Sequence, residues 1–270
     1  MTSVPGSEPC ELIDERHFAV VATAGMLTIG ATVRPAHAEV DLPWTPIGFS
    51  QGGLPLALRH FGDAKNRVLI LGGQHGAPEA NTIDLVNRLT EHFVANPGEV
   101  PGTLGLDILA ITNPDGATSG SRQYLSGVDP NRNWGGPDWA SDAADSNGQF
   151  RRGLGGPEPF SEQETRALAD WMLRSRPVMT VNYHSAGGFM FGSRDGAAGE
   201  ITMAYVNASG YWAPTPGAGS SPLPYRATGS LNVWARTVGL STIFIELSTP
   251  YVSEFDRNLA GLRAILPRLA

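Results

Sequence analysis

Residues 67–98 read RVLILGGQHGAPEANTIDLVNRLTEHFVANPG. The first five of these residues form an apolar run that is typical of a buried strand. Apolar side chains then recur at the spacing of one helix face, at Ile83, Val86, Leu89 and Phe93. The Asn-Pro-Gly at 96–98 ends this helix. A buried strand followed by an amphipathic helix is the repeating unit of an α/β fold.

Strands and helices alternate along the rest of the chain. Short edge strands are expected within 39–66, and buried strands at LDILAI (106–111), PVMTVNY (177–183) and STIFIEL (241–247). Ser161 and Glu164 have the spacing of a capping box, which opens a helix to about Arg174. A closing helix is expected at about 253–266. We therefore predict an α/β fold with a mixed, mostly parallel central sheet and helices on both faces.

Composition limits the function classes. The chain has 270 residues, 41% of them hydrophobic, and a net charge of −7. This length is enough for one sizeable core, and no repeat or linker divides it. The acidic balance argues against a nucleic-acid partner. The stretch 117–160 carries no periodicity and is rich in Gly, Asp, Asn and Trp, which is typical of a functional loop in a compact domain.

The first 38 residues have features of a secretory signal peptide. An apolar stretch at 17–33 is followed by Ala36-His37-Ala38, a cleavage pattern. The acidic residues within 1–15 are atypical of such a leader, and a buried N-terminal helix is the alternative. We predict a signal peptide at 1–38, a catalytic domain at 39–270, and a periplasmic or secreted protein without a membrane anchor. Cleavage removes Cys10, the only cysteine, so a metal site must use His and carboxylate ligands.

Ionisable residues lie at three predicted strand ends, where α/β sheets carry their functional groups. His75 follows the first strand, His184 ends the third, and Glu246 lies near the end of the fourth. Two His and one carboxylate with an open position make a catalytic zinc site, and His75, Glu79 and His184 supply that set. Each residue alone also has a structural explanation, such as Glu79 complementing the helix dipole. Glu246 is the hardest to explain structurally, because a charge within an apolar strand is costly.

These residues lie in motifs that resemble the zinc carboxypeptidase family, especially its short bacterial, murein-peptide-amidase-like members. The matching runs occur in the family's order: GGQHGAPEA (72–80), NPDG (113–116), SRQYLSGVDPNRNW (121–134), GPEPFSEQET (156–165), NYHSAGG (182–188), YRATGSL (225–231) and FIELST (244–249). They span about two thirds of the chain. The resemblance implies the fold, Zn²⁺ as cofactor and a peptide hydrolase activity.

The resemblance also implies roles for residues at the metal. His75, Glu79 and His184 match the zinc ligands of the family. Glu246 matches the general base, and Arg122 matches the residue that polarises the scissile carbonyl.

Four further residues match the family's substrate site. Asn131 and Arg132 resemble the pair that binds the terminal carboxylate of the substrate, and the planar fork of an arginine suits a carboxylate. Tyr225 aligns with the tyrosine that closes over the bound substrate. Leu231 lies where the family sets its side-chain pocket, although that alignment needs a gap of one residue.

The first motif departs from the family. The family has His-x-x-Glu, whereas His75 and Glu79 are separated by three residues. Pro78 disfavours helical geometry at Ala77, so the helix is expected to start at Pro78 or Glu79. A bulge can absorb the extra residue; otherwise Gln74 or Asn81 substitutes as an oxygen ligand. The irregular spacing thus concerns Glu79 and leaves the two histidines in the family's pattern.

Three functional hypotheses follow. The leading one is a secreted, monomeric zinc carboxypeptidase that hydrolyses C-terminal peptide bonds, or γ-glutamyl bonds of cell-wall peptides. The first alternative is an amidohydrolase of the N-acyl-amino-acid deacylase type on the same fold. The second is a metal-poor protein that binds peptides or murein without cleaving them, which the irregular His75–Glu79 spacing suggests. The preferred side chain and its stereochemistry stay open.

Overall fold

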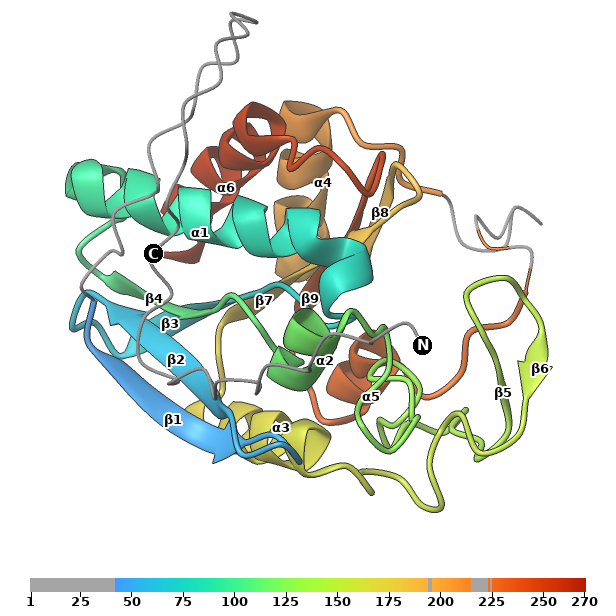
Figure 1. Cartoon of the computed structure of the whole chain (residues 1–270). Coiled ribbons are helices and arrows are strands. Elements are labelled where there is room, and N and C mark those ends of the chain that lie inside the picture. The colour runs from blue at the N-terminus through green and yellow to red at the C-terminus, as the bar shows by residue number, and fades with distance from the viewer. Residues whose placement is uncertain (1–41, 194–195, 215–222, 224) are drawn as a thin grey trace, which may run out of the picture. The chain divides into compact units, whose positions relative to one another are not determined.

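The computed structural model describes residues 42–193, 196–214, 223 and 225–270. Its centre is a seven-stranded sheet in the order β1-β2-β4-β3-β7-β9-β8 (Figure 1). The strands are β1 (Trp44–Phe49), β2 (Pro55–Phe61), β3 (Asn66–Leu71), β4 (Leu104–Leu109), β7 (Met179–Ser185), β8 (Phe189–Gly192) and β9 (Thr242–Leu247). β4, β3, β7 and β9 run parallel, and β1, β2 and β8 complete the sheet by antiparallel pairing. The predicted mixed, mostly parallel sheet is confirmed.

Helices cover both faces of this sheet (Figure 1). α1 (Ala80–Ala95), α4 (Gly196–Ser209) and α6 (Phe255–Leu269) share one hydrophobic core with the sheet. α3 (Gln163–Ser175) and α5 (Leu231–Thr237) share a second core on the opposite face. The remaining elements are short: η1 (Ala77–Glu79), η2 (Pro97–Glu99), α2 (Pro114–Ser119), β5 (Ala143–Ala144) and β6 (Phe150–Arg151).

The apolar run in β3 is explained by its two buried faces. Val68 and Ile70 contribute to the core beneath α1, whereas Leu69 and Leu71 contribute to the core beneath α3. All four side chains are almost completely buried. Burying one such side chain stabilises the fold by about 1.5–3 kcal/mol. A substitution by a charged residue at any of the four would therefore place a charge in a core.

One local prediction, the capping box at Ser161 and Glu164, differs from the structure. Ser161 does not open a capping box: the residue before α3 is Glu162, and no side-chain cap is formed there. The Ser161 hydroxyl instead donates to the Glu162 carboxylate, and Glu164 accepts a hydrogen bond from the Gln51 backbone N–H. Ser161 thus bonds to its neighbour in sequence and Glu164 to a distant segment, so neither side chain makes the bond that a capping box requires.

The predicted leader, residues 1–38, lies outside the described residues, so the boundary at residue 39 stays a prediction. Within the part of the chain that the structure describes, no helix has the length and apolar character needed to cross a membrane.

Candidate active site

Three neighbouring strands bring the predicted metal-site residues together. His75 lies four residues after the end of β3, whereas His184 and Glu246 lie close to the ends of β7 and β9. β7 separates β3 from β9, and His184 is directly paired with Glu246 across the β7–β9 ladder. Because parallel strands end at one edge of a sheet, residues from distant parts of the sequence meet there.

His75, Glu79 and His184 form a compact, buried group whose ligand atoms all lie within 4.8 Å of one another. Nδ1 of His75 is 2.6 Å from Oε1 of Glu79, and Nδ1 of His184 is 3.1 Å from Oε2. The two Nδ1 atoms are 3.2 Å apart. Ligand atoms around a tetrahedral zinc ion are about 3.3 Å from one another. The donor set and its spacing therefore fit a zinc ion with an open fourth position.

The irregular spacing between His75 and Glu79 is absorbed at Gly76. This residue has φ 56° and ψ −138°, a conformation that glycine adopts easily. A Cβ at this position would lie only 2.5 Å from the Gly116 carbonyl carbon and 2.5 Å from the Ser121 oxygen. The turn η1 follows, and its last residue is Glu79, so the main helix α1 starts at Ala80, one or two residues later than the predicted start at Pro78 or Glu79.

The two alternative ligands have other partners. Gln74 donates from Nε2 to the Pro130 carbonyl. Asn81 donates to the Thr249 carbonyl and accepts from the Ser185 hydroxyl. Glu79, by contrast, touches both histidines, so it is the oxygen donor that the structure places in the group.

The two carboxylates near the histidines have opposite electrostatic environments. Burial alone would raise the pKa of Glu79, but the charges and hydrogen bonds of His75 and His184 hold that pKa well below its usual value. Burial raises the pKa of Glu246 well above its usual value, and the nearby charge of Glu79 adds to this rise. Glu79 thus suits a ligand that stays ionised, whereas Glu246 suits a group that takes up a proton.

Asp129 is a residue of this site that we did not assign from the sequence. It is fully buried, and its Oδ1 lies 3.2 Å from Nε2 of His75 while it accepts the Asn131 backbone N–H. Burial opposes its ionisation, but Arg122 and His75 hold the pKa of Asp129 well below its usual value. A carboxylate behind a histidine ligand orients the ring and increases its basicity. The sequence signal that could have identified Asp129 is its place in GVDPNRNW (127–134), part of a run that matches the family.

Arg122 also contacts the group formed by His75, Glu79 and His184, here called the metal-site group. Its Nη1 donates to Glu79 at 2.9 Å, its Nε donates to Asp129 at 3.1 Å, and its Nη2 lies 3.0 Å from Nε2 of His75. The structure thus places Arg122 against the metal-site residues. That catalytic role stays a prediction.

Arg132 is a buried cation without a carboxylate partner among the described residues. The residue is 2% exposed, and its side chain donates to the backbone carbonyls of Ala144 and Asn131. The guanidinium carbon lies 5.9 Å from the ring centre of Tyr225. A buried charge is costly unless it is paired, so this arginine is suited to an incoming anion.

Asn131 and Leu231 are joined directly, because the Asn131 side-chain oxygen accepts the Leu231 backbone N–H at 3.0 Å. This bond fixes the first residue of α5 next to the Asn131–Arg132 pair. The Leu231 side chain itself is buried in the core beneath α3 and α5. Its assignment to a substrate pocket, like the closing motion assigned to Tyr225, stays a prediction.

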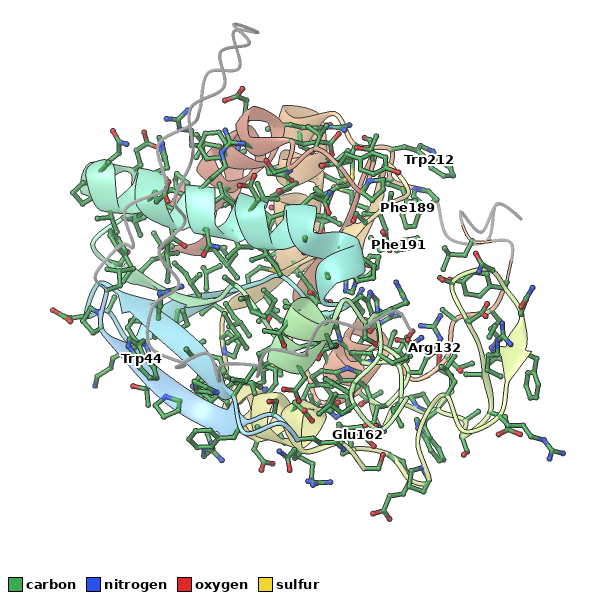
Figure 2. All side chains as sticks on the ribbon, in the orientation of Figure 1. Trp44, Arg132, Glu162, Phe189, Phe191 and Trp212 are labelled. Atoms are coloured by element: carbon green, nitrogen blue, oxygen red, sulfur yellow. The ribbon has the colours of Figure 1, made fainter. Side chains whose placement is uncertain are left out.

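Aromatic rings line the other side of His184. The Phe244 ring packs on the His184 ring at 4.6 Å, and Phe191 stacks on Phe244 at 6.1 Å. Figure 2 shows Phe189, Phe191 and Trp212 gathered at the β8 edge of the sheet, and Phe189 forms a backbone bridge with Trp212. Of these rings, Phe244 is the one that packs on His184, and it is buried, so it shields one face of that ring from solvent.

A family model described as zinc carboxypeptidase matches residues 45–244, well over half of the chain. The chain belongs to the zinc carboxypeptidase family. This membership supports a hydrolase. The match includes the His75, Glu79 and His184 group and ends two residues before Glu246.

Curated relatives share parts of this region. Murein peptide amidase A of Escherichia coli is 30% identical over 124 residues, which is 43% of this chain and 48% of that protein. Carboxypeptidase A2 of Mus musculus is 26% identical over 165 residues, which is 52% of this chain and 38% of that protein. The matches thus span less than half the length of these two relatives.

Solved structures agree on the fold. A murein-tripeptide amidase from Escherichia coli O157 aligns with a TM-score of 0.66 and 24% identity, over 87% of this chain and 96% of that chain. Bovine thrombin-activatable fibrinolysis inhibitor, in complex with a tick carboxypeptidase inhibitor, aligns with a TM-score of 0.67 and 19% identity, over 84% of this chain and 90% of that chain. At these identities the likeness shows the fold alone.

Proposed function

We propose that this zinc carboxypeptidase family member is a zinc-dependent exopeptidase. It hydrolyses the peptide bond that precedes the C-terminal residue of substrates with a free terminal carboxylate. The single observation that carries the proposal is Arg132, a buried cation without a carboxylate partner among the described residues. A substrate carboxylate supplies the missing anion. Arg132 also lowers the pKa of Asp129 and opposes the raised pKa of Glu246, which means that its charge acts at the metal-site group.

Each side chain then has a task. His75, Glu79 and His184 would hold the zinc ion, which supplies a Lewis acid for the scissile carbonyl and for the attacking water. Glu246 accepts the proton of that water and passes it to the leaving nitrogen. Arg122 donates to the carbonyl oxygen as negative charge develops on it. Asn131 and Arg132 fix the substrate's C-terminal carboxylate, so that the last peptide bond is the one presented.

The proposed substrates are peptides with a free C-terminus, including bacterial cell-wall peptides. Two relatives that are named as murein peptide amidases support the second class. We also propose that the protein acts outside the cytoplasm after removal of residues 1–38, the expected leader.

The test is a thermodynamic cycle in which one change is made in the enzyme and the other in the substrate. The enzyme is compared with an Arg132→Ala variant, and each is assayed for kcat/KM on a peptide panel with free or amidated C-termini. Losing one partner of a buried charge pair costs roughly 2–5 kcal/mol, so either change alone should lower kcat/KM by about 30-fold to several-thousand-fold. Both changes together should cost little more than one, because they remove the same interaction.

Arg236→Ala is the matched control, since it removes an exposed arginine from α5. It should leave kcat/KM near that of the unmodified enzyme. Strictly additive losses in the Arg132 cycle would mean that Arg132 does not bind the carboxylate. Equal cleavage of free and amidated peptides by the unmodified enzyme would identify an endopeptidase or an amidase instead.

A further inference from the structure

A chain of buried side-chain amides runs behind the metal-site group. Gln74, which precedes His75, donates from Nε2 to the Pro130 carbonyl at 3.1 Å. Its Oε1 accepts from Nδ2 of Asn182 at 3.1 Å. The same Nδ2 lies 3.1 Å from Nε2 of His184. Asn182 and His184 are both fully buried and lie two residues apart on β7, so their side chains share one face of the sheet.

One atom in this series of amides has no hydrogen-bond partner among the described residues. It is Oδ1 of Asn182, which is buried. A buried, unsatisfied acceptor carries a free-energy cost, because in water it would be hydrogen-bonded. The orphaned oxygen belongs to the same amide that touches His184.

The two ring nitrogens of His184 face different neighbours. Nδ1 faces Glu79 and His75, whereas Nε2 faces Asn182. A neutral imidazole carries one hydrogen, on one nitrogen or the other. When Nδ1 gives its lone pair to a metal ion, the hydrogen is on Nε2, and that N–H needs an acceptor.

We propose that Asn182 is a positioning residue of the metal centre, whose side-chain oxygen accepts the Nε2–H of His184 when Nδ1 binds the metal. Rotating the Asn182 side-chain amide by half a turn exchanges Nδ2 and Oδ1. The hydrogen bond from Nδ2 to Gln74 is then lost. The orphaned oxygen thereby gains its partner in the metal-bound protein, and the buried Nε2–H of His184 gains the acceptor that it needs. This inference rests on the proposed metal site, because it requires His184 to be a ligand.

Thr180 provides a matched control on the same strand. It is also fully buried, it lies on the same face two residues before Asn182, and its hydroxyl is another orphaned polar atom. It has no hydrogen bond to a metal-site residue within the described part of the chain. Thr180→Val removes that hydroxyl at nearly constant shape, as Asn182→Leu removes the amide.

The experiment measures zinc affinity in the whole protein by competition with a chelator, together with thermal unfolding with and without zinc. Asn182→Leu should weaken zinc binding by about 10- to 100-fold, which is typical for loss of a partner behind a metal ligand. The difference between the unfolding midpoints of the zinc-bound and zinc-free forms should shrink accordingly. Asn182→Asp, which offers only acceptor oxygens, should bind zinc within a few-fold of the unmodified protein. Thr180→Val should leave the zinc affinity unchanged.

The outcomes separate this inference from the proposed function. If the unmodified protein binds zinc and Asn182→Leu binds it equally well, the inference is wrong and the proposed function stands. If Asn182→Leu does not fold, Asn182→Asp decides, and a tenfold or greater loss of zinc affinity in that variant overturns the inference. A purely structural role would lower the midpoint of the zinc-free protein and leave the zinc-dependent difference intact. An unmodified protein that binds no zinc would overturn both proposals.

Discussion

At the scale of single residues, the site depends on two carboxylates that the fold treats differently. Glu79 is surrounded by two histidines and Arg122, which stabilise its charge. No described residue donates a hydrogen bond to the Glu246 carboxylate in the structure, and the neighbouring Glu79 disfavours its charge. Two carboxylates whose pKa values are pushed apart can divide the tasks of ligand and proton acceptor between them.

Glu246→Gln tests this division. The substitution keeps the shape of the side chain but removes its ability to accept a proton. Loss of a general base typically lowers the rate by about 10²–10⁴-fold, so kcat should fall by that factor while the zinc content stays whole. Turnover close to that of the unmodified enzyme would exclude Glu246 as the base.

Glu246→Gln should also change how the stability of the zinc-free protein depends on pH. The pKa of Glu246 is raised above its ordinary value of 4.5 in the folded state. The folded state therefore binds more protons than the unfolded state, so this residue's contribution to stability is present below pH 4.5 and is lost as the pH rises through the folded pKa. Denaturant titrations should show equal stability of the two proteins at low pH and a more stable Glu246→Gln variant at neutral pH. Equal stability at neutral pH would contradict the raised pKa.

At the scale of elements, the turn between β3 and α1 decides whether Glu79 reaches the histidines. Gly76→Ala would force a left-handed conformation on alanine and press its Cβ against the backbone at Gly116 and Ser121. Such strain costs on the order of 1–3 kcal/mol, and relieving it would move Glu79 away from His75. We expect both the free energy of unfolding and the zinc affinity to fall, measured by denaturant titration and chelator competition.

Gly120→Ala is the control for this substitution. Gly120 also has a positive φ, of 80°, but a Cβ there would meet nothing within 4 Å. It should lower stability through backbone strain alone and leave zinc binding intact. Equal loss of zinc affinity in the two variants would show that the position of Glu79 does not depend on Gly76.

The elements also show what could be read from the sequence. The apolar runs that became β3, β4, β7 and β9 were predictable, because strands buried on both faces must be continuously apolar. The α4 helix and β8 were not predicted, and Ser161 was assigned to a cap that is not formed. The residues that surround the ligands were harder still, because Asp129 meets His75, and Asn182 meets Gln74, through contacts between distant segments. No local spacing encodes such contacts.

At the scale of the whole molecule, the predicted leader implies that the protein is exported. The pattern Ala36-His37-Ala38 implies cleavage before Glu39. N-terminal sequencing of protein isolated from outside the cytoplasm should therefore begin at Glu39. A folded protein that retains residues 1–38 in the cell envelope would contradict this prediction, and an Ala38→Tyr variant, which blocks the small-residue site, should accumulate uncleaved.

The order of the strands has a consequence for how the chain folds. His75 and His184 are 109 residues apart in sequence, yet they meet because β3 and β7 are parallel neighbours. Contacts between such distant segments form slowly, because the entropy of closing a long loop must be overcome before they contribute. A nascent chain that ends before β7 carries His75 and Glu79 but lacks His184, the third predicted ligand. A metal ion held by all three residues would therefore bind only after β7 has joined β3, so it would stabilise a sheet that is already paired and would not nucleate that pairing.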